Sequence, residues 1–396
     1  MTDITAASPD TQRAAAPAKP ADDRPRIVLL QTQAEAAGAQ EISRILDIGL
    51  TKRGYEVHNA YLYRRTNAFD DQPNVMFCAT ERPGDPVGLL KLAYRLYRYL
   101  RDLKPDAIVC FQHYGNIAGA VAARLAGVPY VIANRNGPAG VVPKWVWPID
   151  RAFGTAGAFD RMVVNCKTVA DEYVDYPAAY RKRVHRIDHG FEPKQSNATK
   201  ADARAAFGLP ADATLLGSVA RLSPKKGHDR AIRLLPGTDW HLAVVGQGAE
   251  HDNLVALGQS LGVSDRLHFL GEVSTEGVAK FLRALDVFVF PTTMETFGLA
   301  GAEAAAAGVP VVATDLPVLE EVLAVDDEPA AVFVDTADTA AFAHAVRTVL
   351  DDEQLRNDIC ARGRALPKRY SLDGMVDQYA SLIEELRAQR PKLKGA

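Results

Sequence analysis

Residues 26–62 read RIVLLQTQAEAAGAQEISRILDIGLTKRGYEVHNAYL, and they set the expected architecture of the first half of the chain. The opening RIVLLQTQ is a short apolar run that is typical of a buried strand. Apolar residues then recur at helical spacing from Ile42 to Leu50, and Gly54 is placed where a helix would end. The following YEVHNAYL predicts a second strand. Strand, helix and strand at this spacing indicate a βαβ unit of a parallel sheet.

The same alternation continues to residue 190 and starts again near residue 213. Further strands are predicted from DAIVCFQ, PYVIAN and RMVVNCK in the first series, and from TLLGSVA, HLAVVGQG, LHFLG, DVFVFP, VPVVATD and AAVFVD in the second. The sequence therefore predicts two tandem doubly wound α/β domains, 25–190 and 211–368. A polar, turn-rich linker, 191–210, is expected between them, and a long helix, 369–390, is expected after the second.

Composition supports this organisation and restricts the function. The 396 residues are 47% apolar, which is enough for two cores, and the net charge of -3 gives no support to nucleic-acid binding. The four cysteines have no metal-binding spacing, so we expect reduced thiols, no metal and a cytoplasmic location. Residues 1–24 lack both periodicity and the features of a signal peptide, and we expect a disordered tail there and a frayed end over 391–396.

Two loops of the second series have features of a phosphate site. In GSVARLSPKKGHDRAI, Arg221, Lys225 and Lys226 cluster between a predicted strand and a helix. Fixed cations beside a helix N-terminus suit a phosphate or diphosphate, although a solvated basic loop has the same composition. In VVGQGAE, Gly246 and Gly248 permit a tight turn, as in many strand-to-helix turns.

The segment ETFGLAGAEAAAAGVPVV, residues 295–312, places two glutamates in an apolar setting. A helix is predicted to start near Gly298, so its first N–H groups form an anion site. Glu295 then lies at the mouth of the helix and Glu303 lies in its second turn. A buried carboxylate needs a partner. For Glu303 that partner is either a ligand or a basic side chain in a buried ion pair.

Other candidates follow predicted strands of the first series. Gly38 precedes a helix whose N-terminus would face the cleft between the domains, or it belongs to a plain turn. His113 and His189 each follow a strand, and each is either structural or directed into that cleft.

Taken together, these segments resemble the retaining glycosyltransferases of family 4, which have the GT-B fold. The resemblance covers nearly the whole chain after the first tail, and the segments stand in the order of the family: GSVARLSPKKG, VVGQGAE, FLGEVS, then PTTMETFGLAGAEAAAAGVPVVATD. The last segment fits the E-x7-E motif of the family, with Glu295 and Glu303 as its glutamates. The final helix would then cross back onto the N-terminal domain.

The resemblance implies a set of functional residues. Glu295, Arg221 and Lys226 would be catalytic, with the two cations holding the donor diphosphate and Glu295 beside the donor sugar. Glu303 would accept hydrogen bonds from the ribose hydroxyls. The other implied donor-binding residues are Gly38, Gly246, Gly271, Val273, Phe297, Gly298 and Leu299.

The implied activity is transfer of a hexose or related sugar from a UDP- or GDP-sugar to a glycan or lipid-linked acceptor, with retention of anomeric configuration. No cofactor is implied, and the chain contains no D-x-D of the kind that metal-dependent glycosyltransferases use. Two alternatives stay open. One is a nucleotide-sugar 2-epimerase, and the other is a non-catalytic nucleotide-sugar-binding protein.

The sequence departs from the family after the strand PYVIAN. Relatives commonly have a histidine there that contacts the donor sugar, whereas this chain has Asn134, Arg135 and Asn136. Arg135 either contacts an anionic group or forms a structural ion pair. Together with His113, Arg135 and Asn136 are candidates for acceptor or sugar contacts.

The acceptor half of the chain gives weaker signals. LLKLAYRLYRYLRDL interleaves apolar residues with four basic ones. Such a helix either contacts an anionic surface, which would be the inner face of the cytoplasmic membrane, or covers the sheet with a solvated basic face. PKWVWPIDRAFG carries two tryptophans that line an acceptor groove, lie at the membrane interface or pack beneath a loop.

Overall fold

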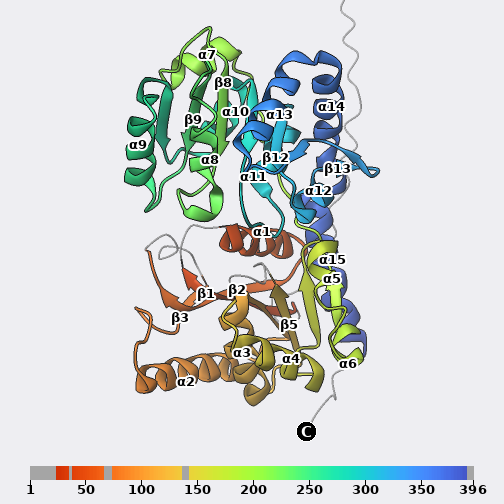
Figure 1. Ribbon diagram of the computed structural model, residues 1–396. Coiled ribbons are helices and arrows are strands. Elements are labelled where there is room, and N and C mark those ends of the chain that lie inside the picture. The colour runs from red at the N-terminus through yellow and green to blue at the C-terminus, as the bar shows by residue number, and fades with distance from the viewer. Residues whose placement is uncertain (1–23, 35–37, 67–73, 136–141, 390–396) are drawn as a thin grey trace, which may run out of the picture.

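The computed structural model describes residues 24–34, 38–66, 74–135 and 142–389. It consists of two α/β halves, one above the other in Figure 1, with helix α1 at their junction. Each half is built on a parallel sheet, and together they have the GT-B architecture expected from the sequence. The expected tails lie outside the described residues, apart from Arg24, and so does Asn136.

The first half contains a seven-stranded sheet with the order β3-β2-β1-β4-β5-β6-β7. The strands are β1 (Arg26–Ala34), β2 (Glu56–Arg64), β3 (Val75–Phe77), β4 (Ala107–Phe111), β5 (Tyr130–Arg135), β6 (Arg161–Val164) and β7 (Val184–Arg186). The helices are α1 (Gly38–Lys52), α2 (Pro86–Leu103), α3 (Gln112–Ala126), α4 (Val146–Ala156), α5 (Lys167–Asp171) and α6 (Ala178–Arg181). The strand order reverses between β1 and β4, which is where ligands bind in doubly wound sheets.

The second half contains a six-stranded sheet with the order β10-β9-β8-β11-β12-β15. The strands are β8 (Leu215–Val219), β9 (His241–Val245), β10 (Leu267–Gly271), β11 (Val287–Phe290), β12 (Val311–Thr314) and β15 (Val332–Val334), with β13 (Ala324–Val325) and β14 (Glu328–Pro329) as a small hairpin. The helical segments are α7 (Lys200–Ala206), η3 (Pro224–Lys226), α8 (His228–Ile232), α9 (His251–Ser260), η4 (Ser264–Arg266), α10 (Thr275–Ala284), α11 (Leu299–Ala306), α12 (Pro317–Val322), α13 (Thr339–Asp351) and α14 (Glu353–Arg369). Here the strand order reverses between β8 and β11.

The stretch 191–210, expected to be a linker, contains helix α7. Arg204 of α7 is buried, donates to the carbonyl oxygen of Ala284 over 3.0 Å and pairs with Asp286 at 2.8 Å. These contacts attach α7 to the second sheet. The connecting chain therefore ends by residue 199, because a buried arginine that satisfies its donors in this way makes α7 part of the second half.

Helix α15 (Leu372–Gln389) returns to the first half and packs beside α1 (Figure 1). Gly49 of α1 permits the close approach, since a Cβ there would lie 2.6 Å from the Val376 side chain. The buried hydroxyl of Tyr379 donates to Asn134 Oδ1 over 2.5 Å, and Arg161 pairs with Glu385 at 2.7 Å. The final helix thus crosses back as predicted.

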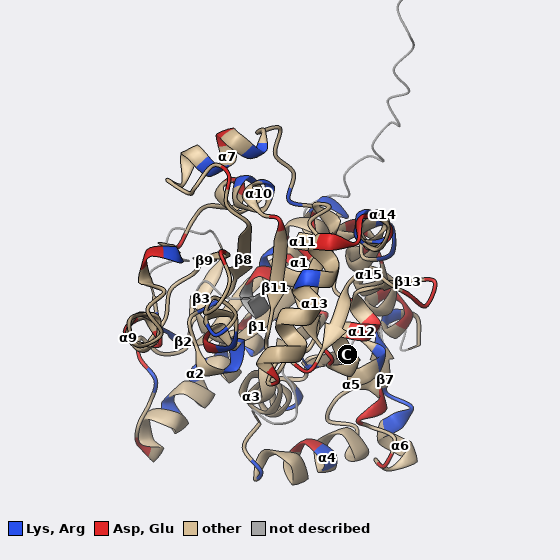
Figure 2. Ribbon diagram, turned by 45° about the horizontal axis from the view of Figure 1, so that its top comes forward, with Lys and Arg blue, Asp and Glu red and all other residues tan. Residues whose placement is uncertain are grey.

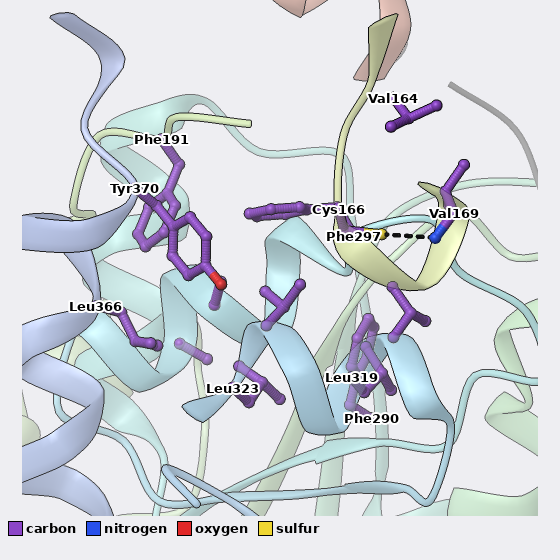
Figure 3. Close-up of a cluster of buried hydrophobic side chains, with 14 of the residues drawn as sticks. Val164, Cys166, Val169, Phe191, Phe290, Phe297, Leu319, Leu323, Leu366 and Tyr370 are labelled. Atoms are coloured by element: carbon purple, nitrogen blue, oxygen red, sulfur yellow. Dashed lines mark hydrogen bonds between the residues drawn. The ribbon is translucent and has the colours of Figure 1, made fainter. Parts of the chain in front are cut away.

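Side chains from both halves meet in one hydrophobic cluster, drawn in Figure 3. Cys166 and Val169 of the first half lie close to Phe297 and Leu319 of the second. Phe191 and Tyr370 belong to the two segments in which the chain passes from one half to the other. The amide of Phe191 donates to the carbonyl oxygen of Tyr370 over 2.9 Å. The two crossings therefore lie side by side.

A carboxylate also joins the halves. Glu321 of α12 accepts hydrogen bonds from the amides of Lys167 and Thr168 at 2.6 and 2.7 Å, and it pairs with Arg186 at 3.0 Å. These two amides are among the first N–H groups of α5, which have no partner within the helix. Glu321 therefore caps a helix of the opposite half.

Helix α2 lies on the outer surface of the first half, and Figure 2 shows basic segments along it. Leu92, Leu96 and Leu100 are buried on the sheet side, while Leu90 and Tyr94 are exposed. The helix thus covers the sheet, and contact of its outer face with an anionic membrane stays a prediction. Among the described residues, no helix has the length and apolarity needed to cross a membrane.

The bond from Tyr379 to Asn134 gives a test of how firmly α15 holds the first half. Tyr379→Phe leaves Asn134 Oδ1 buried without this donor, so we expect a loss of about 1–3 kcal/mol in the free energy of unfolding. Tyr94→Phe, at an exposed position of α2, should change it by less than about 0.5 kcal/mol. Denaturant unfolding measures both variants. Equal effects would show that the crossing contact contributes nothing specific.

Candidate active site

A cavity of about 280 Å³ lies between the two halves, at the carboxyl ends of β8 and β11. Ile42 of α1 and His189 contribute to its wall from the first half. The second half supplies Val219, Ala220, Arg221, Lys226, Phe290, Glu295, Thr296, Phe297, Gly298, Leu299 and Ala300. The cavity is therefore at the point where the order of the second sheet reverses, the position expected for a ligand of such a sheet. We call it the interdomain cavity.

The loop that carries Arg221, Lys225 and Lys226, which we call the basic loop, is in close contact with the loop after β11. Gly227 has a φ of +64°, and a Cβ there would lie 2.1 Å from the carbonyl oxygen of Pro291, so a larger residue does not fit. The amide of Thr293 donates to the carbonyl oxygen of Lys225 over 2.8 Å. Across this contact, Nζ of Lys226 lies 2.5 Å from Oε1 of Glu295. Two of the three predicted catalytic residues, Lys226 and Glu295, are thus an ion pair in the wall of the cavity.

Arg221 differs from Lys226 in its partners. Its side chain is exposed and lines the interdomain cavity, and it makes no hydrogen bond or ion pair with any of the described residues. Lys226 is held by Glu295, whose Oε1 also accepts from the hydroxyl of Thr292 over 3.2 Å. Arg221 therefore presents an uncompensated positive charge to the cavity, and Lys226 a partly compensated one.

The glycines of VVGQGAE serve the same loop. Gly246 has a φ of +139°, and a Cβ on it would lie 2.0 Å from the carbonyl oxygen of Ala220. A Cβ on Gly248 would lie 2.1 Å from the carbonyl oxygen of Leu222. The close approach that these glycines permit is therefore to the backbone of the basic loop. Gly246 also donates to the carbonyl oxygen of Gly271 over 2.8 Å. Gly246, Gly271 and Val273 lie outside the wall of the interdomain cavity.

Phe297 fixes the start of α11. Its buried ring meets the ring of Tyr370 edge-on with centroids 5.0 Å apart, and that of His189 at 5.5 Å. Gly298 follows with a φ of +83° and caps the helix. Leu299 and Ala300, the first residues of α11, line the cavity, so the N-terminal end of the helix lies at its wall. The side chain of Phe297 thus points into the core of the molecule and anchors the backbone beside the cavity.

Glu303 has a basic side chain as its partner. Its Oε1 lies 3.3 Å from Nζ of Lys194, which belongs to the connecting chain, and both side chains are largely buried. Burial raises the pKa of the Glu303 carboxyl, and the nearby Lys194 acts in the opposite direction. Of the two partners that the sequence left open, the structure contains the ion pair. Glu303 is not in the wall of the interdomain cavity.

A second cavity, of about 470 Å³, lies in the first half at the carboxyl ends of its strands; we call it the N-terminal cavity. Its wall consists of Thr32, Gln33, Tyr63, Arg82, Gln112, His113, Tyr114, Asn116, Asn134, Arg135, Val142, Val146, Trp147, Asp150, Met162 and Tyr173. It shares no lining residue with the interdomain cavity. The aromatic and polar side chains together suit a polar ring with apolar faces.

Arg135 and His113 both line the N-terminal cavity. Arg135 is buried, pairs with Glu172 and has its guanidinium 4.4 Å from the ring centre of Trp147. Nε2 of His113 is enclosed and has no hydrogen-bond partner among the described residues, and burial lowers the pKa of this imidazole. Gln112, just before it, has a φ of +62°, which is uncommon for a residue other than glycine. The strand-to-helix turn is thus strained where it meets the cavity.

The comparisons with known proteins agree with this geometry. A model described as Glycosyltransferase Family 4 matches residues 41–195, and one described as Glycosyl transferases group 1 matches residues 199–366. The D-inositol 3-phosphate glycosyltransferase of Acidothermus cellulolyticus is 32% identical over 314 residues, which are 71% of this chain and 68% of that protein. This chain belongs to the family 4 glycosyltransferases.

Two further comparisons limit what can be concluded from this similarity. The enzyme of the same name from Mycolicibacterium smegmatis is 33% identical over 242 residues, and the match spans only 55% of its length. The structure of HepE from Anabaena in complex with UDP and glucose has a TM-score of 0.78 and covers 91% of this chain and 100% of that one, at 17% identity. The second likeness concerns the fold alone.

In this family 4 glycosyltransferase, the glutamates of the E-x7-E motif have different surroundings. Glu295 lies in the wall of the interdomain cavity, whereas Glu303 lies beside the connecting chain. Gly38 is the first residue of α1. Of the implied donor-binding residues, the structure brings Arg221, Lys226, Glu295, Phe297, Gly298 and Leu299 together around one cavity. Their roles toward a donor stay predictions.

The family histidine is absent from β5, and His189 is a residue that the predicted site left out. His189 is buried, and burial lowers its pKa to about 4, so its imidazole is neutral near pH 7. It makes no hydrogen bond with the described residues and lines the interdomain cavity from the first half. Its position after a predicted strand was the only signal in the sequence, and His113 shares that signal.

Asp150 of α4 is a residue of the N-terminal cavity that the sequence did not indicate. Its Oδ2 accepts a hydrogen bond of 2.9 Å from the hydroxyl of Tyr180, and its side chain lines the N-terminal cavity. Burial raises the pKa of the Asp150 carboxyl from its ordinary 3.8 to about 6, more than Tyr180 and Arg135 lower it. A carboxylate at this depth is retained at a cost in stability.

The pH dependence of this cost in stability can be predicted. The folded-state pKa of Asp150 is above its unfolded value, so its contribution to stability is fully present below pH 3.8 and is lost as the pH rises through 6. The loss corresponds to about 3 kcal/mol, from about 1.4 kcal/mol per pKa unit. Asp150→Asn should therefore gain stability relative to the parent between pH 4 and pH 7, as measured by denaturant unfolding. A constant difference across that range would contradict the raised pKa.

Proposed function

We propose that this chain transfers a sugar from a UDP- or GDP-sugar to an acceptor hydroxyl, with retention of anomeric configuration. The observation that carries the proposal is the convergence of Arg221, Lys226 and the N-terminus of α11 on one interdomain cavity. Two cations and a helix N-terminus form a site for a diphosphate. The names of the relatives support a glycosyltransferase activity, and the UDP bound to HepE supports a uridine donor.

In the proposed reaction, the bond between the anomeric carbon and the diphosphate oxygen breaks, and a bond to the acceptor oxygen forms on the same face. The acceptor proton moves to an oxygen of the leaving diphosphate. Negative charge therefore grows on the diphosphate, and Arg221 and Lys226 are complementary to that charge. Glu295 pairs with Lys226. We propose that it also stabilises the positive charge that develops at the anomeric carbon.

The N-terminal cavity supports transfer over the two alternatives. An epimerase or a donor-binding protein needs only the donor site, whereas this chain has a second polar cavity at the carboxyl ends of the first sheet. We propose that the acceptor binds there. The glycan or lipid-linked nature of the acceptor, and the hexose identity of the donor sugar, belong to the same proposal.

A thermal-shift screen across UDP-, GDP- and ADP-sugars tests the donor site, because a ligand that binds the native state raises its melting temperature. We expect a UDP- or GDP-sugar to stabilise the protein. Arg221→Ala should weaken that binding by about 1.5–3 kcal/mol, since it removes a charged partner of the diphosphate. Arg233→Ala, at an exposed position of the same half, is the control.

The product distinguishes the candidate reactions. Proton NMR of the purified product should show the anomeric configuration of the donor sugar. Epimerisation at C2 of the donor without any acceptor would replace the proposal with the epimerase, and donor binding without turnover would replace it with a binding protein.

We propose that Glu303 accepts hydrogen bonds from the donor ribose. These bonds would either replace its ion pair with Lys194 or form in addition to it. Glu303→Gln should then raise the dissociation constant for the nucleotide by about 10- to 100-fold, as expected for losing a hydrogen bond to a charged group. Isothermal titration with the free nucleoside diphosphate measures this change. Glu320→Gln, an exposed glutamate of α12, is the matched control. An unchanged nucleotide affinity in the folded Glu303 variant would exclude the contact with the ribose. The ion pair with Lys194 would then be the role of Glu303.

A further inference from the structure

The charges in the wall of the N-terminal cavity restrict which acceptor it accommodates. Among the lining residues that the structure describes, the charged side chains are Arg82, Arg135 and Asp150. Arg135 is already neutralised by Glu172 and is enclosed between the rings of Trp147 and Tyr173. Arg82 is exposed. The interior charge of the cavity is therefore set by the carboxyl of Asp150.

A hydrogen bond from the buried Tyr180 holds the side chain of Asp150 in position. The side chain of Tyr180 is fully buried, and its ring approaches α4 so closely that a Cβ on Gly154 would lie 2.3 Å from it. Its hydroxyl donates to Oδ2 of Asp150. This bond occupies one lone pair of one carboxyl oxygen and leaves other acceptor positions of Asp150 toward the cavity.

A carboxylate in such a position is complementary to hydroxyl groups and repels phosphate. A buried unpaired charge near a second negative charge is costly, whereas hydroxyl donors satisfy a carboxylate and gain charge-assisted bonds. The rings of Tyr114 and Trp147 also line the cavity, and the C–H face of a polyhydroxylated ring can pack against such aromatic surface.

We propose that Asp150 binds hydroxyl groups of the acceptor, and that the acceptor is an uncharged polyhydroxylated ring, a sugar or a cyclitol without a phosphate. This inference rests on the proposed function, since it takes the N-terminal cavity as the acceptor site. Asp150 is a specificity-determining residue in this arrangement. It selects against the phosphorylated form of the same ring.

The decisive experiment compares matched acceptors with the donor from the thermal-shift screen. The pairs are myo-inositol with inositol 3-phosphate, and glucose with glucose 6-phosphate. We expect the neutral member of at least one pair to be used with a kcat/KM at least about 10-fold above its phosphate, the lower bound for a charge-assisted hydrogen-bond network. A preference of the same size for the phosphorylated member would overturn the proposal.

Asp150→Asn tests the residue itself. The amide oxygen can still accept from Tyr180, and the loss of the buried charge favours folding above pH 6, so the variant should fold. We expect its KM for the neutral acceptor to rise by about 10-fold or more. The KM for the donor should rise less than the KM for the acceptor, because the donor cavity shares no lining residue with this one. Asp175→Asn, an exposed aspartate of the same half, is the control. An unchanged acceptor KM would refute the role of Asp150.

A pH profile separates binding from a structural role. Hydroxyl donors favour the ionised carboxylate, so the acceptor KM of the parent should fall as the pH rises through about 6, and Asp150→Asn should lose that part of the profile. The charged and titratable groups that share the cavity with Asp150 are Arg82, Arg135, His113, Tyr63, Tyr114 and Tyr173. Tyr176, Tyr180 and Glu172 lie close to Asp150 or to Arg135. They are present in both proteins, and the difference between the two profiles belongs to Asp150. Identical profiles would contradict the proposal.

The outcome also distinguishes this inference from the proposed function. If the donor is neither transferred nor hydrolysed, the proposed transfer fails, and saturation-transfer NMR of myo-inositol with the parent and with Asp150→Asn then tests the cavity alone. Binding to the parent that is lost in the variant supports the inference without turnover. Equal signals from both proteins, or none from either, overturn it.

Discussion

The packing of Phe297 against Tyr370 and His189 is the contact on which the rest of the structure depends. Phe297 belongs to the second half, His189 to the first, and Tyr370 to the return crossing, so one buried ring joins three separate parts of the chain. The backbone on either side of this ring supplies Glu295 and the N-terminus of α11. The geometry of the interdomain cavity is therefore a consequence of hydrophobic packing between the halves, and it is complete only when both are in place.

The charges around that cavity are arranged in pairs, with one exception. Lys226 is held by Glu295, and Glu303 is held by Lys194, so these buried or partly buried groups are compensated within the protein. Arg221 alone among the predicted donor-binding cations has no partner in the described part of the chain. An anion in the cavity can contact this arginine without displacing a carboxylate, whereas a contact with Lys226 competes with its pair with Glu295.

Much of the fold follows from the sequence because its central strands are buried on both faces. Continuous apolar runs such as DVFVFP identified each of them, and the resemblance to family 4 placed the glutamates of the E-x7-E motif. The edge strands β3 and β7 escaped, since three residues each are too few to show a period or a long apolar run. Helix α7 escaped because its polar sequence is typical of a linker, and its buried contact, Arg204, is a residue type that is seldom buried.

The site was less predictable, for a different reason. Lys194 and Glu303 are distant in sequence, and no local pattern connects them. Elements elsewhere in the chain bury both Asp150 and His189. Burial raises the pKa of the Asp150 carboxyl and lowers the pKa of the His189 imidazole. Gly246 and Gly248 were predicted to permit a tight turn. The sequence did not indicate that the backbone at Ala220 and Leu222 approaches them so closely that a Cβ would not fit.

The two crossings between the halves lie against each other. A Cβ on Gly190 would lie 2.5 Å from the carbonyl oxygen of Ser371, and the amide of Phe191 donates to the carbonyl oxygen of Tyr370. Two segments far apart in the sequence are therefore bound together where the chain passes between the halves. His189, which lines the interdomain cavity, immediately precedes Gly190 in the chain. Any residue larger than glycine at position 190 would thus disturb both crossings and the wall of that cavity at once.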